Sequence, residues 1–293
     1  MAAADSGRLD GRASGFAVLA MAILGGSYTA GKIALHDLPV FGMLCLRMIV
    51  STATLGAYLA WARIPLVRGG RNASYMLGQT GFFLLSQVSL FIGLTLTGAG
   101  RAAIMFNMQP FFTLLLLPLF VPGERVGLRR WMGTLAAFGG VALVLAARGT
   151  GGTLAGDALC LLAALGWTGN VVLNKKMPTE INSAALIFWN VAAAIPVTGF
   201  LSLVLEQGAT WRFTPAAVAS VLYLGTVAAG LGFVLIVWLV RTYSASRVNV
   251  FVFLSPVFGV AIGWALLGEP VGALQGLGAL AVAAGILVVS TEP

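Results

Sequence analysis

The sequence predicts an all-α integral membrane protein in which ten transmembrane helices form two inverted five-helix repeats. Three observations lead to this fold class: a scarcity of charge, ten long apolar runs, and a pattern shared by the two halves of the chain. Only 9% of the 293 residues are charged, 59% are hydrophobic, and the mean hydropathy is +0.97. A soluble domain has about a quarter of its residues charged, and a disordered chain is far less apolar. The composition therefore favours a lipid bilayer.

Ten apolar runs are long enough to cross a membrane, for which a helix needs about 20 apolar residues. The runs are continuous rather than alternating, and their length favours helices over strands. The gaps between them are short, so no soluble domain is expected within the chain. The predicted spans are residues 16–35, 40–61, 74–95, 102–121, 131–147, 158–175, 183–205, 215–239, 248–267 and 273–290.

The second half of the sequence repeats a pattern of the first half. Gly123-Glu124 corresponds to Gly268-Glu269, and Pro110 corresponds to Pro256 at nearly the same displacement. Each repeat contains five spans, and because five is odd the second copy enters the membrane upside down. Inverted repeats are typical of secondary transporters, whose substrate sites lie near the midplane between the halves. The expected parts are a cytoplasmic N-terminal tail at 1–14, a first repeat at 15–148, a linker at 149–156 and a second repeat at 157–291.

The basic residues predict the orientation, since cytoplasmic loops are enriched in Lys and Arg. Of the 17 basic residues, Lys32 and Arg47 lie within spans, and Arg101, Arg148 and Arg212 lie in gaps opposite the N-terminus. All the others share the side of the N-terminus. Both termini are therefore expected in the cytoplasm, with the chain multi-pass in a bacterial inner membrane. The basic residues form no stripe with interleaved aromatics, so no nucleic-acid partner is expected.

Further motifs recur at matching places in the two halves. The first helix of each repeat has a Lys near its end, the second helix of the first repeat has an Arg, and a mid-helix Pro is followed by a Gly-Glu turn. The residues concerned are Lys32, Lys175, Arg47, Pro110 with Gly123-Glu124, and Pro256 with Gly268-Glu269. With these motifs the chain resembles the drug/metabolite transporter superfamily, specifically the EamA-type ten-helix exporters. It departs from their pattern at Leu24, where they have Trp, and at Asn190, where they have Arg.

This resemblance implies an exporter in which spans 1, 3, 4, 6, 8 and 9 line a central cavity and spans 5 and 10 are peripheral. Within the family, the chain is similar to the aromatic amino-acid exporters of the YddG type. The shared motifs are specific for the fold and give no information about the substrate.

Polar and aromatic residues near the middle of the spans are the candidate substrate-binding residues. Trp167 and Asn170 share one helical face, as do Gln79, Phe83 and Gln87. Buried amides are costly in lipid, so each should either face a cavity or pair across helices. A lining of amides and aromatics without charge suits a neutral or zwitterionic solute with an apolar body. The candidates are Tyr28, Gln79, Phe83, Gln87, Asn107, Trp167, Asn170, Tyr223, Asn249 and Phe253.

Two cations and two prolines within spans have separate predicted roles. Lys32 is expected either to extend toward the interface or to attract a substrate carboxylate on the exit side. Arg47 lies deeper and is expected either to bind carbonyl groups inside the bundle or to share that exit-side role. Pro110 and Pro256 each remove one backbone hydrogen bond at equivalent positions. They are expected to act as a pair of hinges, with a static kink as the alternative.

The nine acidic residues all lie in termini, in loops or at span ends. Transport is therefore expected to proceed without a buried carboxylate. The segment from Gly26 to Lys32 matches part of a nucleotide-binding loop, but Ile33 stands where a magnesium-binding Ser or Thr is needed, so no cofactor is expected. Cys45 and Cys160 offer no paired metal-ligand spacing, so no metal site is expected.

Together these patterns predict a secondary transporter that exports small metabolites, foremost aromatic or amphipathic amino acids, by alternating access. Its partners are a small-molecule substrate and the lipid bilayer, and it is expected to be a monomer or a weak homodimer. One alternative is a phosphorylated-metabolite exchanger that uses Lys32 and Arg47. An alternative from another class is an integral-membrane enzyme, for which His36 and Asp37 are too little, and no catalytic residue is expected. The exact substrate, the coupling ion and the direction of net transport stay open.

Overall fold

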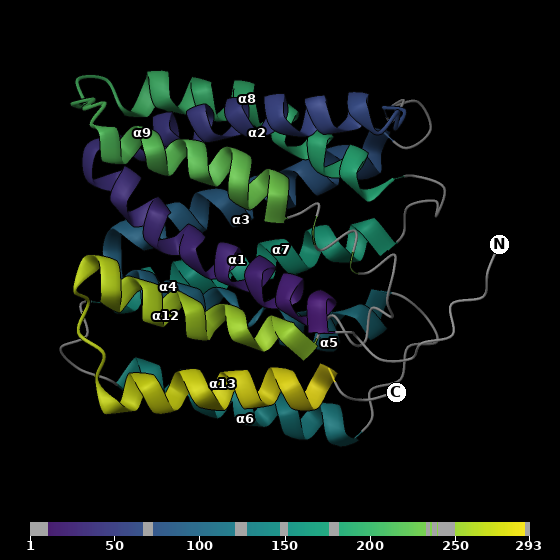
Figure 1. Cartoon of the computed structure of the whole chain (residues 1–293), viewed down its shortest axis with the longest axis vertical. Helices are drawn as coiled ribbons and strands as arrows, with labels where there is room; N and C mark the ends of the chain where they lie inside the picture. The colour runs from purple at the N-terminus through teal and green to yellow at the C-terminus, as the bar shows by residue number, and fades with distance from the viewer. Residues whose placement is uncertain are drawn as a thin grey trace.

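The computed structural model in Figure 1 describes residues 11–66, 73–120, 128–146, 152–175, 182–232, 235, 239 and 250–290. Within these ranges the structure is helical and contains no strand. The elements are α1 (Gly11–Asp37), α2 (Val40–Trp61), α3 (Ala73–Leu96), α4 (Ala99–Phe106), α5 (Gln109–Phe120), α6 (Leu128–Ala146), α7 (Leu154–Lys175), α8 (Ser183–Leu205), α9 (Pro215–Leu222), the π-helix η2 (Tyr223–Gly232), the 3₁₀ turn η3 (Val250–Phe253), α12 (Leu254–Leu267) and α13 (Ala273–Ser290).

Over the described ranges, these elements form ten helical rods at the places where ten spans are predicted. Six stretches are long and apolar enough to cross a membrane: Gly11–Asp37, Val40–Trp61, Ala73–Leu96, Leu154–Asn174, Ala184–Leu205 and Pro215–Gly232. Three shorter helices are also apolar: Trp131–Ala146, Leu254–Leu267 and Ala273–Gly285. The remaining rod is the fourth, which is divided into α4 and α5. The all-helical fold class is thus confirmed, and the chain is a multi-pass membrane protein.

The fourth rod is interrupted at Asn107 and Met108, just before Pro110. Proline has no N–H and its ring clashes with the preceding turn, so it breaks a continuous helix. Helix α5 begins after this break, where the Phe111 amide donates a hydrogen bond to the Met108 carbonyl (3.0 Å). In the ninth rod, Pro256 likewise lies in the first turn of α12, directly after η3. Both prolines therefore lie beside helix breaks, whereas their movement as hinges stays a prediction.

Helices α6 and α13 pack closely through glycines. A side chain on Gly140 would meet the carbonyl oxygen of Gly278 at 2.7 Å, and one on Gly285 would meet that of Gly133 at 2.5 Å. Backbone atoms therefore occupy the space that any larger residue would need. Residue numbers rise along α6 as they fall along α13, so the two helices run antiparallel.

The rods lie side by side with their axes roughly parallel (Figure 1). The pair of α6 and α13 forms one flank and the pair of α2 and α8 forms the other, while α1, α3, α4 and α7 lie between them. The flanking helices expose large apolar side chains, such as Leu135, Phe200 and Leu280, which are 68%, 65% and 62% exposed. Such a surface suits contact with lipid. The functional residues are therefore expected on the inward-facing sides of the helices.

Candidate functional site

Side chains from four inner helices meet beside the break in the fourth rod. The ring of Tyr28 on α1 lies edge-to-face with Phe106 at the end of α4, with centroids 6.2 Å apart. Phe106 lies edge-to-face with Trp167 of α7 at 6.3 Å, and Trp167 lies 6.5 Å from Phe83 of α3. Asn107, within the break, donates to the carbonyl one turn earlier (2.7 Å) and approaches the Tyr28 hydroxyl (3.4 Å). We call these five residues the aromatic cluster.

The sequence had singled out every member of the aromatic cluster except Phe106. Its position in the sequence could have identified it, because Phe106 directly precedes Asn107 and lies four residues before Pro110. A proline leaves the carbonyl four residues earlier without its usual donor, so the helix ends there and the side chain of Phe106 lies at the break. The structure brings the other four together, while their role in binding stays a prediction.

The predicted amides of α3 and α7 differ in their bonding. The side chain of Asn170 donates to the backbone carbonyl of Gln79 (3.0 Å), and Gln87 accepts from Arg47 (2.6 Å). These two amides therefore pair across helices, which was the alternative to lining a cavity. Gln79 is 1% exposed, and its side-chain amide has no hydrogen-bond partner among the described residues. The hydroxyl of Ser86, which is 0% exposed, also has none. Leaving such a group unpaired costs about 1–3 kcal/mol.

The predicted residues of the eighth and ninth rods contribute less to this site. The Tyr223 hydroxyl donates to the carbonyl of Ile23 (2.8 Å), so Tyr223 ties η2 to α1. Asn249 lies outside the described residues. Phe253 is the last residue of η3, and its side chain is likewise outside the described part of the structure. The aromatic cluster is thus built by α1, α3, α4 and α7.

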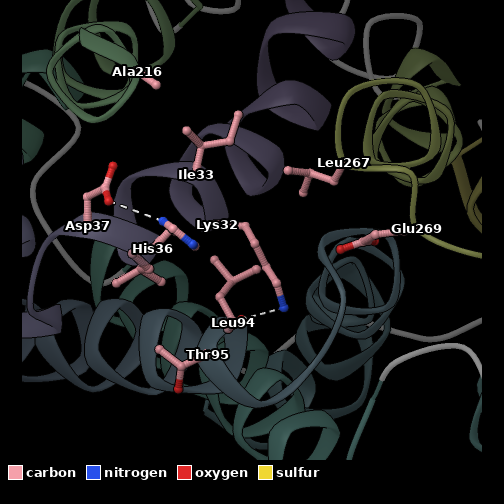
Figure 2. A pocket seen from close by; sticks show the side chains of 10 residues that line it. Lys32, Ile33, His36, Asp37, Leu94, Thr95, Ala216, Leu267 and Glu269 are labelled. Atoms are coloured by element: carbon pink, nitrogen blue, oxygen red, sulfur yellow. Dashed lines mark hydrogen bonds and ion pairs between the residues drawn. The ribbon is translucent and has the colours of Figure 1, made fainter. Parts of the chain in front are cut away.

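A cavity of about 520 Å³ lies at the end of α1 where α3, α9 and α12 also meet (Figure 2). Its lining includes Lys32, His36, Asp37, Leu94, Leu267 and Glu269. Apart from Lys32, none of the predicted binding residues lines it. The predicted central cavity is therefore not this one, which lies at the ends of the helices, on the side that the charge pattern predicts to be external. Its volume is within the range of small-molecule sites.

Two of the lining residues hold the turn between α3 and α4. The Lys32 ammonium donates to the carbonyls of Leu94 (3.0 Å) and Thr97 at the C-terminal end of α3. The Glu269 carboxylate accepts from the amides of Ala99 (2.6 Å) and Gly100 (3.0 Å) at the start of α4. Each charge therefore lies at the helix end whose dipole it complements. Lys32 points into the protein and does not extend into lipid.

Glu269 reaches α4 because of the residue before it. Gly268 follows the last residue of α12 with a φ of 64°, a left-handed conformation that favours glycine. Its amide still bonds to the carbonyl of Trp264 (3.1 Å). The chain then turns toward α4, so at this position the glycine permits the turn and the glutamate binds the start of α4, whereas Gly123-Glu124 lies outside the described residues.

Arg47 lies on α2 and reaches α3. One of its terminal nitrogens donates to the side-chain oxygen of Gln87 (2.6 Å), and its guanidinium lies 5.0 Å above the ring of Phe91. The Nε atom is buried without a hydrogen-bond partner in the described structure. No carboxylate of the described residues lies within salt-bridge distance of it. Arg47 thus contacts a neutral amide and an aromatic ring, and no sequence pattern indicated Phe91.

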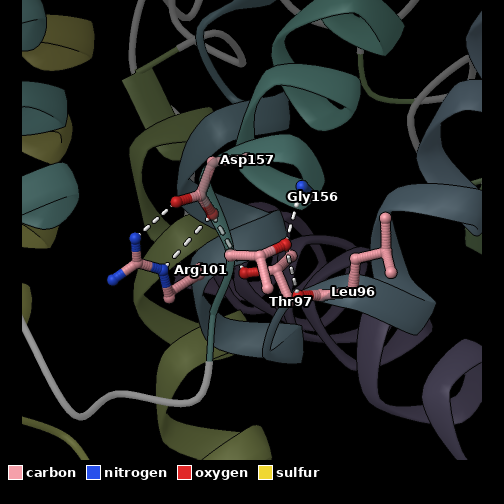
Figure 3. A network of polar contacts seen from close by, with 6 residues as sticks. Leu96, Thr97, Arg101, Gly156 and Asp157 are labelled. Carbon is pink, nitrogen blue, oxygen red and sulfur yellow. Dashed lines mark hydrogen bonds and ion pairs between the residues drawn. The ribbon is translucent and has the colours of Figure 1, made fainter.

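The placement of Arg101 corrects one expectation, and Asp157 is its partner (Figure 3). Arg101 belongs to α4 and is 3% exposed, so it does not lie in an external loop. The carboxylate of Asp157, in the first turn of α7, is 0% exposed and is paired with the Arg101 guanidinium. That transport proceeds without a buried carboxylate stays a prediction, although the chain does contain an unexpected buried carboxylate in Asp157, which lies at a helix end and not in mid-membrane. Its charge is compensated, and the Thr97 hydroxyl also donates to it (2.9 Å).

The chemistry that these residues can perform is binding. The described residues contain no group of His, Cys, Asp and Glu that could hold a metal ion. The ring nitrogen of His36 lies 3.1 Å from Asp37, but the His36 side chain is 83% exposed and belongs to no nucleophile arrangement. The site residues instead offer aromatic rings, the unpaired side-chain amide of Gln79 and two cations. This combination suits reversible contact with a small organic solute.

Comparison with known proteins agrees with this chemistry. The model of the EamA-like transporter family matches residues 12–146 and again residues 154–291. A "Probable amino-acid metabolite efflux pump" of Salmonella typhimurium is 30% identical over an alignment of 291 positions that covers 94% of each chain. A protein of Escherichia coli with the same description is 28% identical, over 93% of this chain and 92% of its own. A crystal structure that is 18% identical superposes with a TM-score of 0.68 and covers 94% of this chain and 96% of its own, which shows that the fold is shared.

Proposed function

Because the chain belongs to the EamA-like transporter family, we propose that it exports amino acids or similar amphipathic metabolites by alternating access. The observation that carries the proposal is the aromatic cluster, which lies at a helix break between α1, α3, α4 and α7. Aromatic side chains offer a large apolar contact area, and their polar tips can orient a ligand. The relatives described as amino-acid metabolite efflux pumps support the choice of amino acids.

We also propose that the two halves are inverted repeats, an arrangement that supplies the two access states of alternating access. Helices α6 and α13 are the fifth helices of the two halves, and they run antiparallel. If Gly133 corresponds to Gly278 and Gly140 to Gly285, a two-fold rotation converts the contact of Gly140 with Gly278 into the contact of Gly285 with Gly133. Both contacts are present. The family model, which matches each half once, supports the same division.

The breaks beside Pro110 and Pro256 provide the places at which the fourth and ninth rods can bend. Secondary transporters commonly build their sites from such interrupted helices. Under this proposal, the aromatic cluster is reached from the cytoplasm in one state and opens toward the cavity beside Lys32 in the other. The cavity side is external, in agreement with the surplus of Lys and Arg on the opposite side.

Purified protein reconstituted into liposomes tests the proposal. We expect uptake of labelled amino acids with aromatic or large aliphatic side chains, but not of purines or sugar phosphates. A phosphorylated-metabolite exchanger would require Lys32 and Arg47 to converge on one phosphate. Instead they bind α3 at Leu94 and Gln87, seven residues apart, or roughly 10 Å along the helix. Uptake of sugar phosphates alone would refute the proposal.

A further inference from the structure

Arg47 lies inside the bundle without a compensating negative charge. Charged side chains within a membrane are costly, and they are normally paired or mark a ligand path. Here the neutral amide of Gln87 and the ring of Phe91 are the partners that the described structure provides, and the Nε atom remains unpaired. By contrast, the other buried guanidinium, Arg101, is paired with Asp157. Arg47 therefore retains the capacity to bind an anion.

Lys32 has a similar incomplete partnership at the cavity. Its ammonium donates to the carbonyls of Leu94 and Thr97, both neutral, and it is not within salt-bridge distance of any described carboxylate. Its side chain also lines the cavity. An ammonium has three donors, so one remains available to a solute in the cavity.

The two cations are arranged in sequence along α3. Arg47 contacts α3 at Gln87 and Phe91, and Lys32 contacts it at Leu94. Phe91 is 2% exposed, and its ring lies near the helix backbone of α1, where a side chain on Gly31 would meet it at 2.9 Å. Along α3, Phe91 therefore lies between Gln87, which binds Arg47, and Leu94, which binds Lys32.

We propose that Arg47 and Lys32 are two successive binding positions for the carboxylate of the exported solute, separated by Phe91. The inference rests on the proposed function, for which it defines the substrate class as carboxylated solutes with an apolar body. Arg47 binds the carboxylate inside the bundle while Phe91 and the aromatic cluster contact the apolar body. Rotation of Phe91 then gives the carboxylate access to Lys32 in the cavity.

The cavity also favours a zwitterion over a simple anion. Asp37 and Glu269 line it together with Lys32, and Figure 2 shows the Glu269 carboxylate directed toward the side on which the Lys32 ammonium lies. Glu269 already accepts two amide hydrogens, and each carboxylate oxygen can accept more than one. An α-amino acid can therefore place its carboxylate at Lys32 and its ammonium near Glu269.

A binding measurement tests the inference without depending on transport. The thermal unfolding midpoint of the purified protein is measured with L-phenylalanine, L-leucine, L-phenylalaninamide and phenethylamine. We expect the two amino acids to raise the midpoint in a concentration-dependent manner and the amide and the amine to bind at least tenfold more weakly. That factor corresponds to about 1.4 kcal/mol. Equal or stronger stabilisation by the amide or the amine, or no stabilisation by either amino acid, overturns the inference.

Variants assign the two positions. Arg47→Gln is expected to weaken phenylalanine binding about tenfold, with partial recovery in Arg47→Lys, and Lys32→Gln is expected to weaken it less because Lys32 lies in the outer cavity. Arg63→Gln is the matched control, since Arg63 is exposed and lies just after the C-terminal end of α2. If Arg47→Gln folds but binds phenylalanine like Arg63→Gln, the assignment is overturned. If a variant does not fold, the preference of the unmodified protein for amino acids over the amide and the amine still tests the inference.

The same solutes in a transport assay separate this inference from the proposed function. If amino acids bind selectively through their carboxylate but do not cross the membrane, the inference stands and the export function fails. If phenylalanine is transported and phenylalaninamide competes equally well, the export function stands and the carboxylate positions are refuted.

Discussion

Replacing Asp157 with Ala is expected to be strongly destabilising, because its partner Arg101 is buried. The two side chains are 0% and 3% exposed, and they form an ion pair that Thr97 supports with a hydrogen bond of 2.9 Å. Removing one partner of a buried ion pair costs about 3–5 kcal/mol. With roughly 2–4 °C per kcal/mol for a chain of this size class, the unfolding midpoint should fall by roughly 6–20 °C.

The assay is thermal unfolding of the purified protein in detergent, followed by tryptophan fluorescence. The control is the double variant Asp157→Leu with Arg101→Leu, in which no charge remains buried. Replacing both partners of a buried pair with apolar residues is often nearly neutral. The double variant should therefore be more stable than Asp157→Ala. An unchanged midpoint in Asp157→Ala, or a double variant that is less stable than the single one, would refute the reasoning.

Three further changes test other contacts. Gly140→Leu should separate α6 from α13, because even its Cβ would lie 2.7 Å from the Gly278 carbonyl, and should lower the unfolding midpoint by an amount equivalent to about 1–3 kcal/mol; an unchanged midpoint would disprove the close packing. Glu269→Gln removes the charge at the start of α4 and should cost about 1–2 kcal/mol in the same measurement, whereas equal stability would show that the carboxylate is dispensable. Combined Pro110→Ala and Pro256→Ala substitution should reduce transport in liposomes more than expression, and equal losses would favour static kinks.

The helices could be predicted closely from the sequence because their cause is local. A run of about 20 apolar residues must become a helix in lipid, where backbone groups have no water to bind. The predicted span 40–61 matches α2, and the predicted span 273–290 matches α13. Pro110 also predicted a hinge or kink in the fourth rod, because the effect of a proline on its helix comes from its own ring.

The partners of the charged residues could not be predicted, because they depend on which helices become neighbours. Arg101 and Asp157 are separated by two predicted spans and the linker, and each was expected in a gap or at the end of a span. Glu269 was recognised only as part of a turn, although it binds the start of α4, 170 residues earlier. Phe91 was not among the predicted residues, because its contact with Arg47 depends on the packing of α2 against α3.

The aromatic cluster could be predicted from the sequence only in part. The helical spacing of Trp167 and Asn170 correctly predicted a shared face, and Tyr28 and Asn107 were chosen for their polar groups. Phe106, the last residue of α4 before the break, connects the cluster because its ring meets both Tyr28 and Trp167. Whether an amide pairs or stays free was beyond prediction, since Gln87 and Gln79 lie on the same helix and differ only in their neighbours.

The central claim is that the aromatic cluster forms part of an alternating-access path for amino acids. Counterflow in liposomes measures this most directly: vesicles are preloaded with unlabelled L-phenylalanine, and the entry of external labelled L-phenylalanine is followed over time. The account predicts a transient accumulation of label above equilibrium, which should be lost when Trp167→Ala removes the ring between Phe83 and Phe106. Absence of the transient in the unmodified protein, or an undiminished transient in Trp167→Ala, would contradict it.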